Sequence, residues 1–190
     1  MNSSVFSALV PGAGDTVRTQ IAETLRAFGE STLRFVAERG AKVRPLSRSE
    51  RYADASPALV RLRIDVDAWP TPPAGLFVVE ERTIYLRSLS PMTVAHEFGH
   101  ALDCALGEGI YLSGIDPHVR DAFRNARRFV TPYAAAGLDE YFAESVRAFV
   151  GVNDPSSRWP QVSRAMLRRI DPSMFAVVDG IFQRATSRCG

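Results

Sequence analysis

The sequence predicts an α+β fold with a small mixed sheet and a mainly helical C-terminal half. Two observations carry this prediction. Strand-like runs occur only before residue 88, and the segments after residue 89 repeat apolar residues at helical spacing. The chain of 190 residues is 46% hydrophobic and 23% charged, which is enough to bury a core. We therefore expect one globular domain.

The N-terminal part is expected to be a leader followed by two helices. Residues 1–14 are rich in Ser, Gly and Ala and predict a flexible leader, so that 15–190 form the domain. Asp15 is a candidate N-cap, and a second helical segment covers 31–40 and closes at a glycine. The first helix is indicated by apolar residues at helical spacing, namely Val17, Ile21, Leu25 and Phe28.

Three strands are expected between the helices. Residues 41–47 suit a short strand, and 76–79 and 83–87 suit two more, joined by a tight charged turn. Residues 48–73 give no clear pattern and end in the loop sequence WPTPPAG. The sheet and the first helices make up 15–88 of the predicted domain.

The remaining residues, 89–190, are expected to form a helical subdomain. Ser90 followed by Pro91 is a strong start signal for a helix, with serine at the N-cap and proline at the first helical position. Later segments with helical periodicity are 117–129, 138–151, 160–169 and 172–184.

Charge and cysteine content narrow the classes of function. The net charge of +2 gives no strong electrostatic case for nucleic-acid binding. No apolar run reaches the ~18 residues of a membrane span. The N-terminus has no basic segment before its apolar patch, so it does not resemble a cleaved secretion signal. Cys104 and Cys189 do not form a disulfide framework, and whether they pair stays open.

The segment SPMTVAHEFGHALDCAL, residues 90–106, holds two of the three histidines. His96 and His100 are four residues apart, so one helical face can present both to a single metal ion. Glu97 lies beside them, where it can reach a water on that ion. This is the arrangement of H-E-x-x-H zinc hydrolases, and we prefer it to a chance match. Gly99, inside the helix, predicts close packing over that position.

A catalytic zinc ion needs a third protein ligand. The metzincin extension is excluded, because Asp103 and Leu106 stand where that class has glycine and histidine. His118 stays open as a ligand or stabilising residue, although a solvent-facing position is the simpler expectation. Glu140 and Glu144 are one turn apart on a later helix. Alone they would be a solvated acidic stripe, but beside H-E-x-x-H one of them can complete a His-His-Glu site.

HEFGHALD, followed some forty residues later by EYFAESVRAF, resembles the catalytic domain of anthrax lethal factor. It also resembles the secreted Pro-Pro endopeptidases of clostridia and bacilli, which belong to the gluzincin, zincin-like metalloproteases. The resemblance implies that Glu140 is the third zinc ligand and that Glu144 orients a ligand histidine. It also implies a catalytic role for Tyr133, seven residues before Glu140. Weaker likeness extends from about Glu30 to the C-terminus.

The function that this implies is zinc-dependent cleavage of a peptide bond, with one Zn²⁺ per chain. Glu97 would take a proton from the attacking water, and Tyr133 would help to stabilise the oxyanion. An extended protein or peptide substrate is expected to pair with the strand 83–87 of a monomeric enzyme, with no nucleic acid involved. Cys104 is expected to be a buried small residue rather than a ligand.

The cellular role stays open at this stage. A secreted or injected bacterial toxin or effector, exported without a cleaved signal, is favoured by the resemblance. One alternative is a cytoplasmic regulatory zinc protease that cleaves a repressor of the same cell. Another is a non-catalytic binding module that docks on phosphates through the arginines of the predicted helix 117–129, namely Arg120, Arg124, Arg127 and Arg128.

Overall fold

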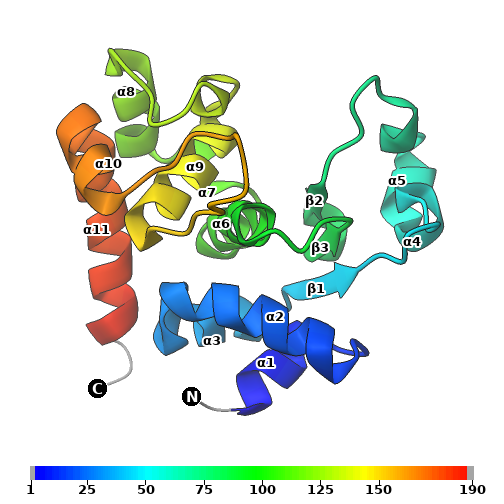
Figure 1. Cartoon of the computed structure of the whole chain (residues 1–190). Coiled ribbons are helices and arrows are strands. Elements are labelled where there is room, and N and C mark those ends of the chain that lie inside the picture. Colours follow the sequence, from blue (N-terminus) through cyan, green and yellow to red (C-terminus); the bar gives the residue numbers. More distant parts are fainter. Residues whose placement is uncertain (1–2, 188–190) are drawn as a thin grey trace.

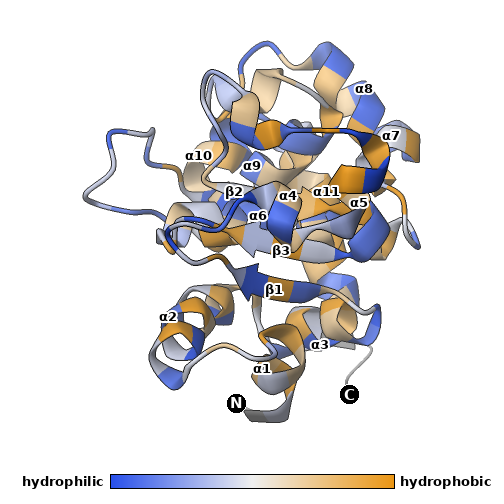
Figure 2. Ribbon diagram, turned by 90° about the vertical axis from the view of Figure 1, so that its right-hand side faces the viewer, coloured by the Kyte–Doolittle hydropathy of each residue, from blue (hydrophilic) through white to orange (hydrophobic). Residues whose placement is uncertain are grey.

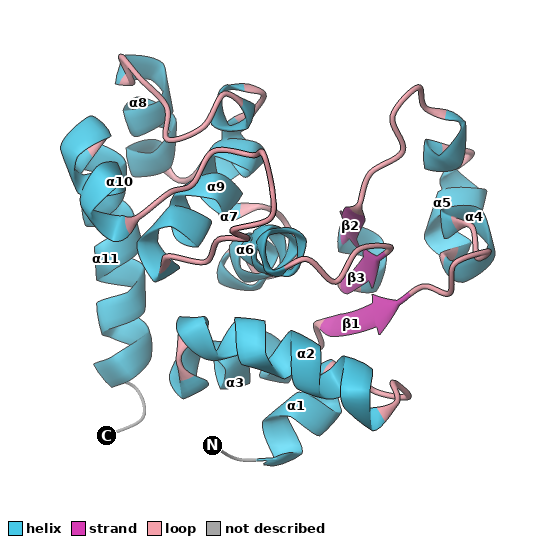
Figure 3. Ribbon diagram, in the orientation of Figure 1, coloured by secondary structure: helices cyan, strands magenta, loops and turns pink. Residues whose placement is uncertain are grey.

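The computed structural model describes residues 3–187, and these form an α+β fold with a small mixed sheet, as predicted. Figures 1 and 3 show the sheet beside the central helix α6, Pro91–Leu106, with a layer of helices on the other side. The remaining α-helices are α1 Ser3–Leu9, α2 Asp15–Leu25, α3 Glu30–Glu38, α4 Tyr52–Ala55, α5 Pro57–Leu62, α7 Leu112–Ile115, α8 Pro117–Asn125, α9 Leu138–Val150, α10 Arg164–Ile170 and α11 Pro172–Ser187. Short 3-10 helices are η1 Arg26–Phe28, η2 Val66–Ala68, η3 Val79–Glu81 and η4 Tyr133–Ala135.

The sheet has three strands in the order β1-β3-β2. Strand β1, Lys42–Pro45, pairs in parallel with β3, Thr83–Leu86, and β2, Gly75–Val78, pairs with β3 in antiparallel fashion. The two strands predicted at 76–79 and 83–87 are therefore adjacent, as the short turn between them suggested. The prediction that a substrate pairs with 83–87 is wrong, because β3 is the central strand and its two edges are already occupied. Among the described strands, β2 and β1 have the free edges.

Helix α6 runs through the middle of the molecule and is buried on nearly all sides. Apolar side chains such as Val94, Phe98 and Leu102 join the main core, which also receives residues from α2, α3, α9 and α11. Gly99 lies where α6 meets α9: a Cβ there would come within 2.9 Å of the Cα of Ala143. The close packing predicted at Gly99 is confirmed, and it sets how near the two helices approach.

The N-terminal residues differ from the sequence prediction. Residues 3–9 form α1 instead of a flexible leader, because Phe6, Leu9 and Val10 are buried in the main core. Helix α2 begins at Asp15, and its N-cap is Gly14, so Asp15 is the first helical residue and not the cap. In Figure 2 the surface helix α2 shows both hydrophobic and hydrophilic residues, as an amphipathic helix does.

The unassigned segment 48–73 forms α4, α5 and η2, which pack on the sheet as a small second core. Tyr52, Leu59 and Val66 of this segment are buried against Val78 and Tyr85 of the strands. Glu81, before β3, accepts hydrogen bonds from the Ala58 N–H and from the Tyr85 hydroxyl at 2.8 Å and 2.7 Å. Periodicity could not show this unit, because each helix has only one or two turns and gains its stability from the sheet.

The C-terminal half is helical, as predicted, but α8 is shorter than expected. It ends at Asn125, so Arg127 and Arg128 lie beyond the helix that carries Arg120 and Arg124. The four arginines thus do not form one helical row, which weakens the phosphate-docking alternative. Among residues 3–187, none of the helices is long and apolar enough to cross a membrane.

Candidate metal centre

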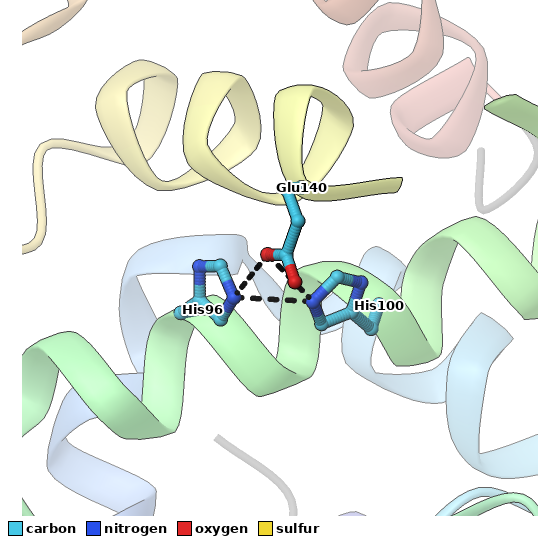
Figure 4. Close-up of side chains that lie close together, drawn as sticks. All are labelled: His96, His100 and Glu140. Atoms are coloured by element: carbon cyan, nitrogen blue, oxygen red, sulfur yellow. Dashed lines mark hydrogen bonds and ion pairs between the residues drawn. The ribbon is translucent and has the colours of Figure 1, made fainter. Parts of the chain in front are cut away.

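The site is built where the buried helices α6 and α9 face each other. The Nε2 atoms of His96 and His100 lie 3.1 Å apart, and both point toward Glu140 of α9 (Figure 4). The Oε2 atom of Glu140 is 3.0 Å from Nε2 of His96 and 3.4 Å from Nε2 of His100. The structure therefore brings together three side chains that are separated by up to forty-four residues along the chain.

These distances fit a tetrahedral zinc ion. Ligand atoms about 2.0 Å from zinc lie about 3.3 Å from one another at tetrahedral angles, close to the observed spacing. The Oε2 atom of Glu140 is buried and has no hydrogen-bond donor of good geometry among the described residues. Nδ1 of His96 donates to Glu144, so a neutral His96 presents its other nitrogen as a lone pair facing this oxygen. Two acceptors that face each other need either a proton or a metal ion between them.

The electrostatics of the chain support the same conclusion. Burial opposes a charge on His96, but the close carboxylates of Glu140 and Glu144 outweigh it and raise the pKa of His96 to about 10. Burial likewise opposes a charge on Glu140, yet the two imidazoles bring the pKa of this carboxyl well below its usual range. The site thus favours a positive charge between its ligands, which a second proton on His96 or a metal ion can supply.

Glu144 is buried behind His96 and fixes the orientation of that imidazole. Its Oε1 atom accepts the hydrogen bond from Nδ1 of His96 at 2.9 Å, and its Oε2 atom accepts one from the Thr131 hydroxyl at 2.7 Å. Arg147, only 1% exposed, contacts both oxygens of Glu144 at 2.9 Å. Glu144 therefore holds the ring of His96 in place, and that His96 is a metal ligand oriented in this way stays a prediction from the resemblance.

Glu97 is buried between the site and the edge strand β2. A Cβ on Gly75 of β2 would lie 2.6 Å from Cγ of Glu97 and 2.8 Å from Cγ2 of Thr93, so any other residue here must displace these side chains. Burial raises the pKa of the Glu97 carboxyl, while the neighbouring histidines and a hydrogen bond from the Phe77 backbone oppose the rise. A carboxylate with a raised pKa beside a metal site has the properties of a general base.

Tyr133 lies at the solvent side of the site. Its hydroxyl donates a hydrogen bond of 2.8 Å to Oε1 of Glu140, and its ring centroid is 5.5 Å from that of His96. Burial and the adjacent carboxylate raise the pKa of Tyr133 above its ordinary value. The phenol therefore stays protonated at neutral pH and keeps a donor at the mouth of the site.

Three other residues from the sequence analysis are not part of this cluster. His118 is exposed at the start of α8. Cys104 is buried and free, and it borders a separate cavity of about 280 Å³, while Cys189 lies outside the described residues. Asp103 accepts hydrogen bonds from the N–H and hydroxyl of Ser113 at 2.8 Å and 2.6 Å.

Sequence reasoning missed several residues that support the site. Arg147 was visible as a basic residue three positions after Glu144, a common ion-pair spacing on a helix. Thr131 and Gly75 gave no local signal, because both act on residues distant in the chain. Tyr111, whose ring lies 5.8 Å from that of His100, was also not identified.

Comparison with known proteins gives no sequence relative: no protein family and no curated protein matches the chain. The structure, however, is similar to the Pro-Pro endopeptidase PPEP-2 from Paenibacillus alvei, with a TM-score of 0.63 and 18% sequence identity. The similarity covers 93% of this chain and 99% of that chain. The chain therefore has the α+β fold of a Pro-Pro endopeptidase.

Proposed function

We propose that this protein is a zinc-dependent endopeptidase. The observation that carries the proposal is the set of three ligand atoms, Nε2 of His96, Nε2 of His100 and Oε2 of Glu140, 3.0–3.4 Å apart beside the buried Glu97. Two imidazoles and one carboxylate with an open position are a typical donor set for catalytic zinc. The fold shared with an enzyme named an endopeptidase supports the same reaction class.

Each residue has a role in hydrolysis that follows from its position. A zinc ion held by His96, His100 and Glu140 would lower the pKa of a water toward ~7 and polarise the scissile carbonyl. Glu97 takes the proton of the attacking water and passes it to the leaving amine. The Tyr133 hydroxyl, which donates its one proton to Glu140 in this structure, turns to donate it to the oxyanion that develops on the carbonyl oxygen.

An extended substrate fits the free edge of β2 better than β3. The N–H of Arg87 donates to the carbonyl of Ala74, which fixes the alternation, so that Gly75 and Phe77 direct their backbone groups away from β3. The Phe77 N–H is already bonded to Glu97, so the backbone of Gly75 and the carbonyl of Phe77 are the groups that a substrate can pair with. Gly75 lies against Glu97. A peptide that adds to this edge therefore passes over the general base and toward the three ligands. Action outside the cell of origin stays a prediction from the sequence resemblance.

The proposal can be tested with a proteome-derived peptide library and zinc-loaded protein. Mass spectrometry should find discrete cleavage sites with the wild type, and these should disappear with a chelator and return with Zn²⁺. Glu97→Ala should bind zinc in the same ratio of one per chain and should cleave none of the sites. Stoichiometric zinc in a wild type that cleaves no peptide, or full activity in Glu97→Ala, would overturn the proposed function.

A further inference from the structure

Trp159 is an exposed aromatic residue beside the candidate active site. Its side chain is 41% exposed, and its ring meets that of Tyr133 edge-on, with centroids 5.9 Å apart. Isolated apolar residues on a surface need no explanation. Trp159 differs from them because its neighbour Tyr133 in turn contacts His96 and Glu140.

The loop that carries Trp159 is held in a defined shape. This loop, 151–163, joins α9 to α10 and is closed by Asn153, whose side chain accepts from the Val162 N–H at 2.9 Å and donates to the Val162 carbonyl at 2.8 Å. The side chain of Gln161 donates to the carbonyl of Asp154 at 3.0 Å, and the backbone N–H of Trp159 donates to the Ser157 hydroxyl at 3.1 Å. The indole is thus presented from an organised loop.

The loop is also tied to the two helices of the metal centre. Asp154 accepts a hydrogen bond of 2.7 Å from the hydroxyl of Ser90, the N-cap residue of α6. Arg147 of α9 donates to the Val152 carbonyl at 3.1 Å and also holds Glu144, the partner of His96. The position of Trp159 relative to the metal ligands is therefore set by the structure around the site.

Two ring contacts, each of less than 6 Å, separate Trp159 from His96. An extended peptide advances about 3.3 Å per residue, so the indole lies within about three residues of a scissile bond at the metal. Indole and phenol rings that meet at 78° form an angular apolar surface, whose polar groups are the indole N–H and the Tyr133 hydroxyl. A large apolar side chain of the substrate is the group that such a surface binds best.

We propose that Trp159, together with Tyr133, forms a subsite that selects a bulky apolar residue of the substrate, within about three residues of the cleaved bond. This inference rests on the proposed endopeptidase function and adds a determinant of its specificity. Trp159 packs on Tyr133 and is not one of the three candidate metal ligands, so it affects which peptides are cleaved and leaves zinc binding unchanged.

The first test compares cleavage profiles of the peptide library for wild type, Trp159→Ala, Trp159→Phe and Arg158→Ala. Trp159→Ala should lose the apolar preference at one substrate position by about tenfold or more, the scale of discrimination by an apolar pocket. Trp159→Phe should retain part of it. Arg158→Ala, an exposed neighbour in the same loop, should keep the full profile. Zinc content and thermal unfolding verify that all variants are folded.

A second test measures binding without cleavage. Random peptides displayed on phage are selected on zinc-loaded Glu97→Gln protein, and the selected peptides are titrated into the Glu97→Gln, Trp69→Phe variant, whose only tryptophan is Trp159. Selected peptides should carry a bulky apolar residue, change the fluorescence of Trp159, and bind about tenfold or more weakly by calorimetry when Trp159 is alanine.

The outcomes separate the two proposals. Peptide cleavage with an unchanged profile in Trp159→Ala would overturn the subsite and leave the endopeptidase in place. Peptide binding that depends on Trp159, with no cleavage by the wild type, would support the subsite and overturn the proposed endopeptidase function. Absence of both cleavage and Trp159-dependent binding would overturn both.

Discussion

Gly99 and Ala143 are in backbone contact where α6 crosses α9: a Cβ on Gly99 would lie 2.9 Å from the Cα and 3.1 Å from the Cβ of Ala143. The contact lies between the turn that carries His96 and His100 and the turn of α9 that follows Glu140. Any side chain at position 99 must push the two helices apart. Because one candidate ligand comes from α9 and two come from α6, the candidate metal site depends on this approach.

We predict that Gly99→Ala weakens both folding and zinc binding. Overpacking costs about 1–3 kcal/mol, which exceeds the ~1 kcal/mol gained from replacing glycine in a helix. Gly180→Ala in α11 is the matched control, because its Cβ would meet only the flexible end of Arg184, at 3.3 Å. Urea unfolding and competition with a chromophoric chelator measure the two effects. Equal behaviour of the two variants would show that the helices can separate freely.

Glu140 and Glu144 should respond differently to substitution. Glu140→Ala removes a proposed ligand and should abolish tight zinc binding, while the metal-free fold loses less stability than in Glu144→Ala because no buried guanidinium is left unpaired. Glu144→Ala leaves the guanidinium of Arg147 buried without its carboxylate, which costs about 3–5 kcal/mol, and zinc affinity falls about 10–100-fold. Zinc titration and urea unfolding in chelator distinguish the two. Tight zinc binding in Glu140→Ala would exclude Glu140 as a ligand.

Gly75→Ala should impair the general base without removing the metal. The new Cβ displaces Glu97, and a displacement of about 1 Å can reduce kcat by about 100-fold. The double variant with Glu97→Ala provides a control in urea unfolding, since Gly75→Ala should cost less stability there than in the wild type once the Glu97 side chain is gone. Steady-state kinetics on a cleaved library peptide and zinc analysis test this. If the losses of stability from the two substitutions were additive in the double variant, Gly75→Ala would not act through Glu97.

Tyr133→Phe should reduce kcat by roughly 10²–10³, the scale of a single oxyanion donor. The phenol also donates to Glu140, so we expect zinc affinity to fall by no more than about tenfold. His118→Ala, on the surface of α8, should retain normal kinetics. A normal kcat in Tyr133→Phe together with inactive His118→Ala would reverse the assignment.

Asp103 should make stability depend on pH in a narrow range. Burial raises the pKa of this carboxyl from 3.8 to about 6. The folded state therefore binds the proton more tightly than the unfolded state does. The stability contributed by protonated Asp103 is complete below about pH 4 and is lost as the pH rises to about 6. As the pH rises through this range, the free energy of unfolding of Asp103→Asn should increase relative to that of the wild type by on the order of 2–3 kcal/mol. Urea unfolding in chelator at several pH values measures this difference, and a constant value would contradict the assignment.

Local patterns in the sequence were enough to predict the frame of the molecule. The histidines four residues apart, the strands before them and the helices after them follow from period and capping, which involve near neighbours. The α+β class with its small mixed sheet is confirmed on that basis. The proximity of Glu140 to the histidines agrees with the resemblance, and the chemical role of each site residue stays a prediction.

Tertiary structure alone decided features that depend on distant residues. Residues 3–9 are a helix because the core receives Phe6 and Leu9, and β2 instead of β3 is at the edge because β1 pairs with β3. The helical period of α9 alone would place Glu144 in a solvated acidic stripe, yet Glu144 and Arg147 are both buried because α6 and the loop 151–163 cover them. The physical reason is that sequence period determines which residues share a face, whereas packing against other elements determines what that face contacts.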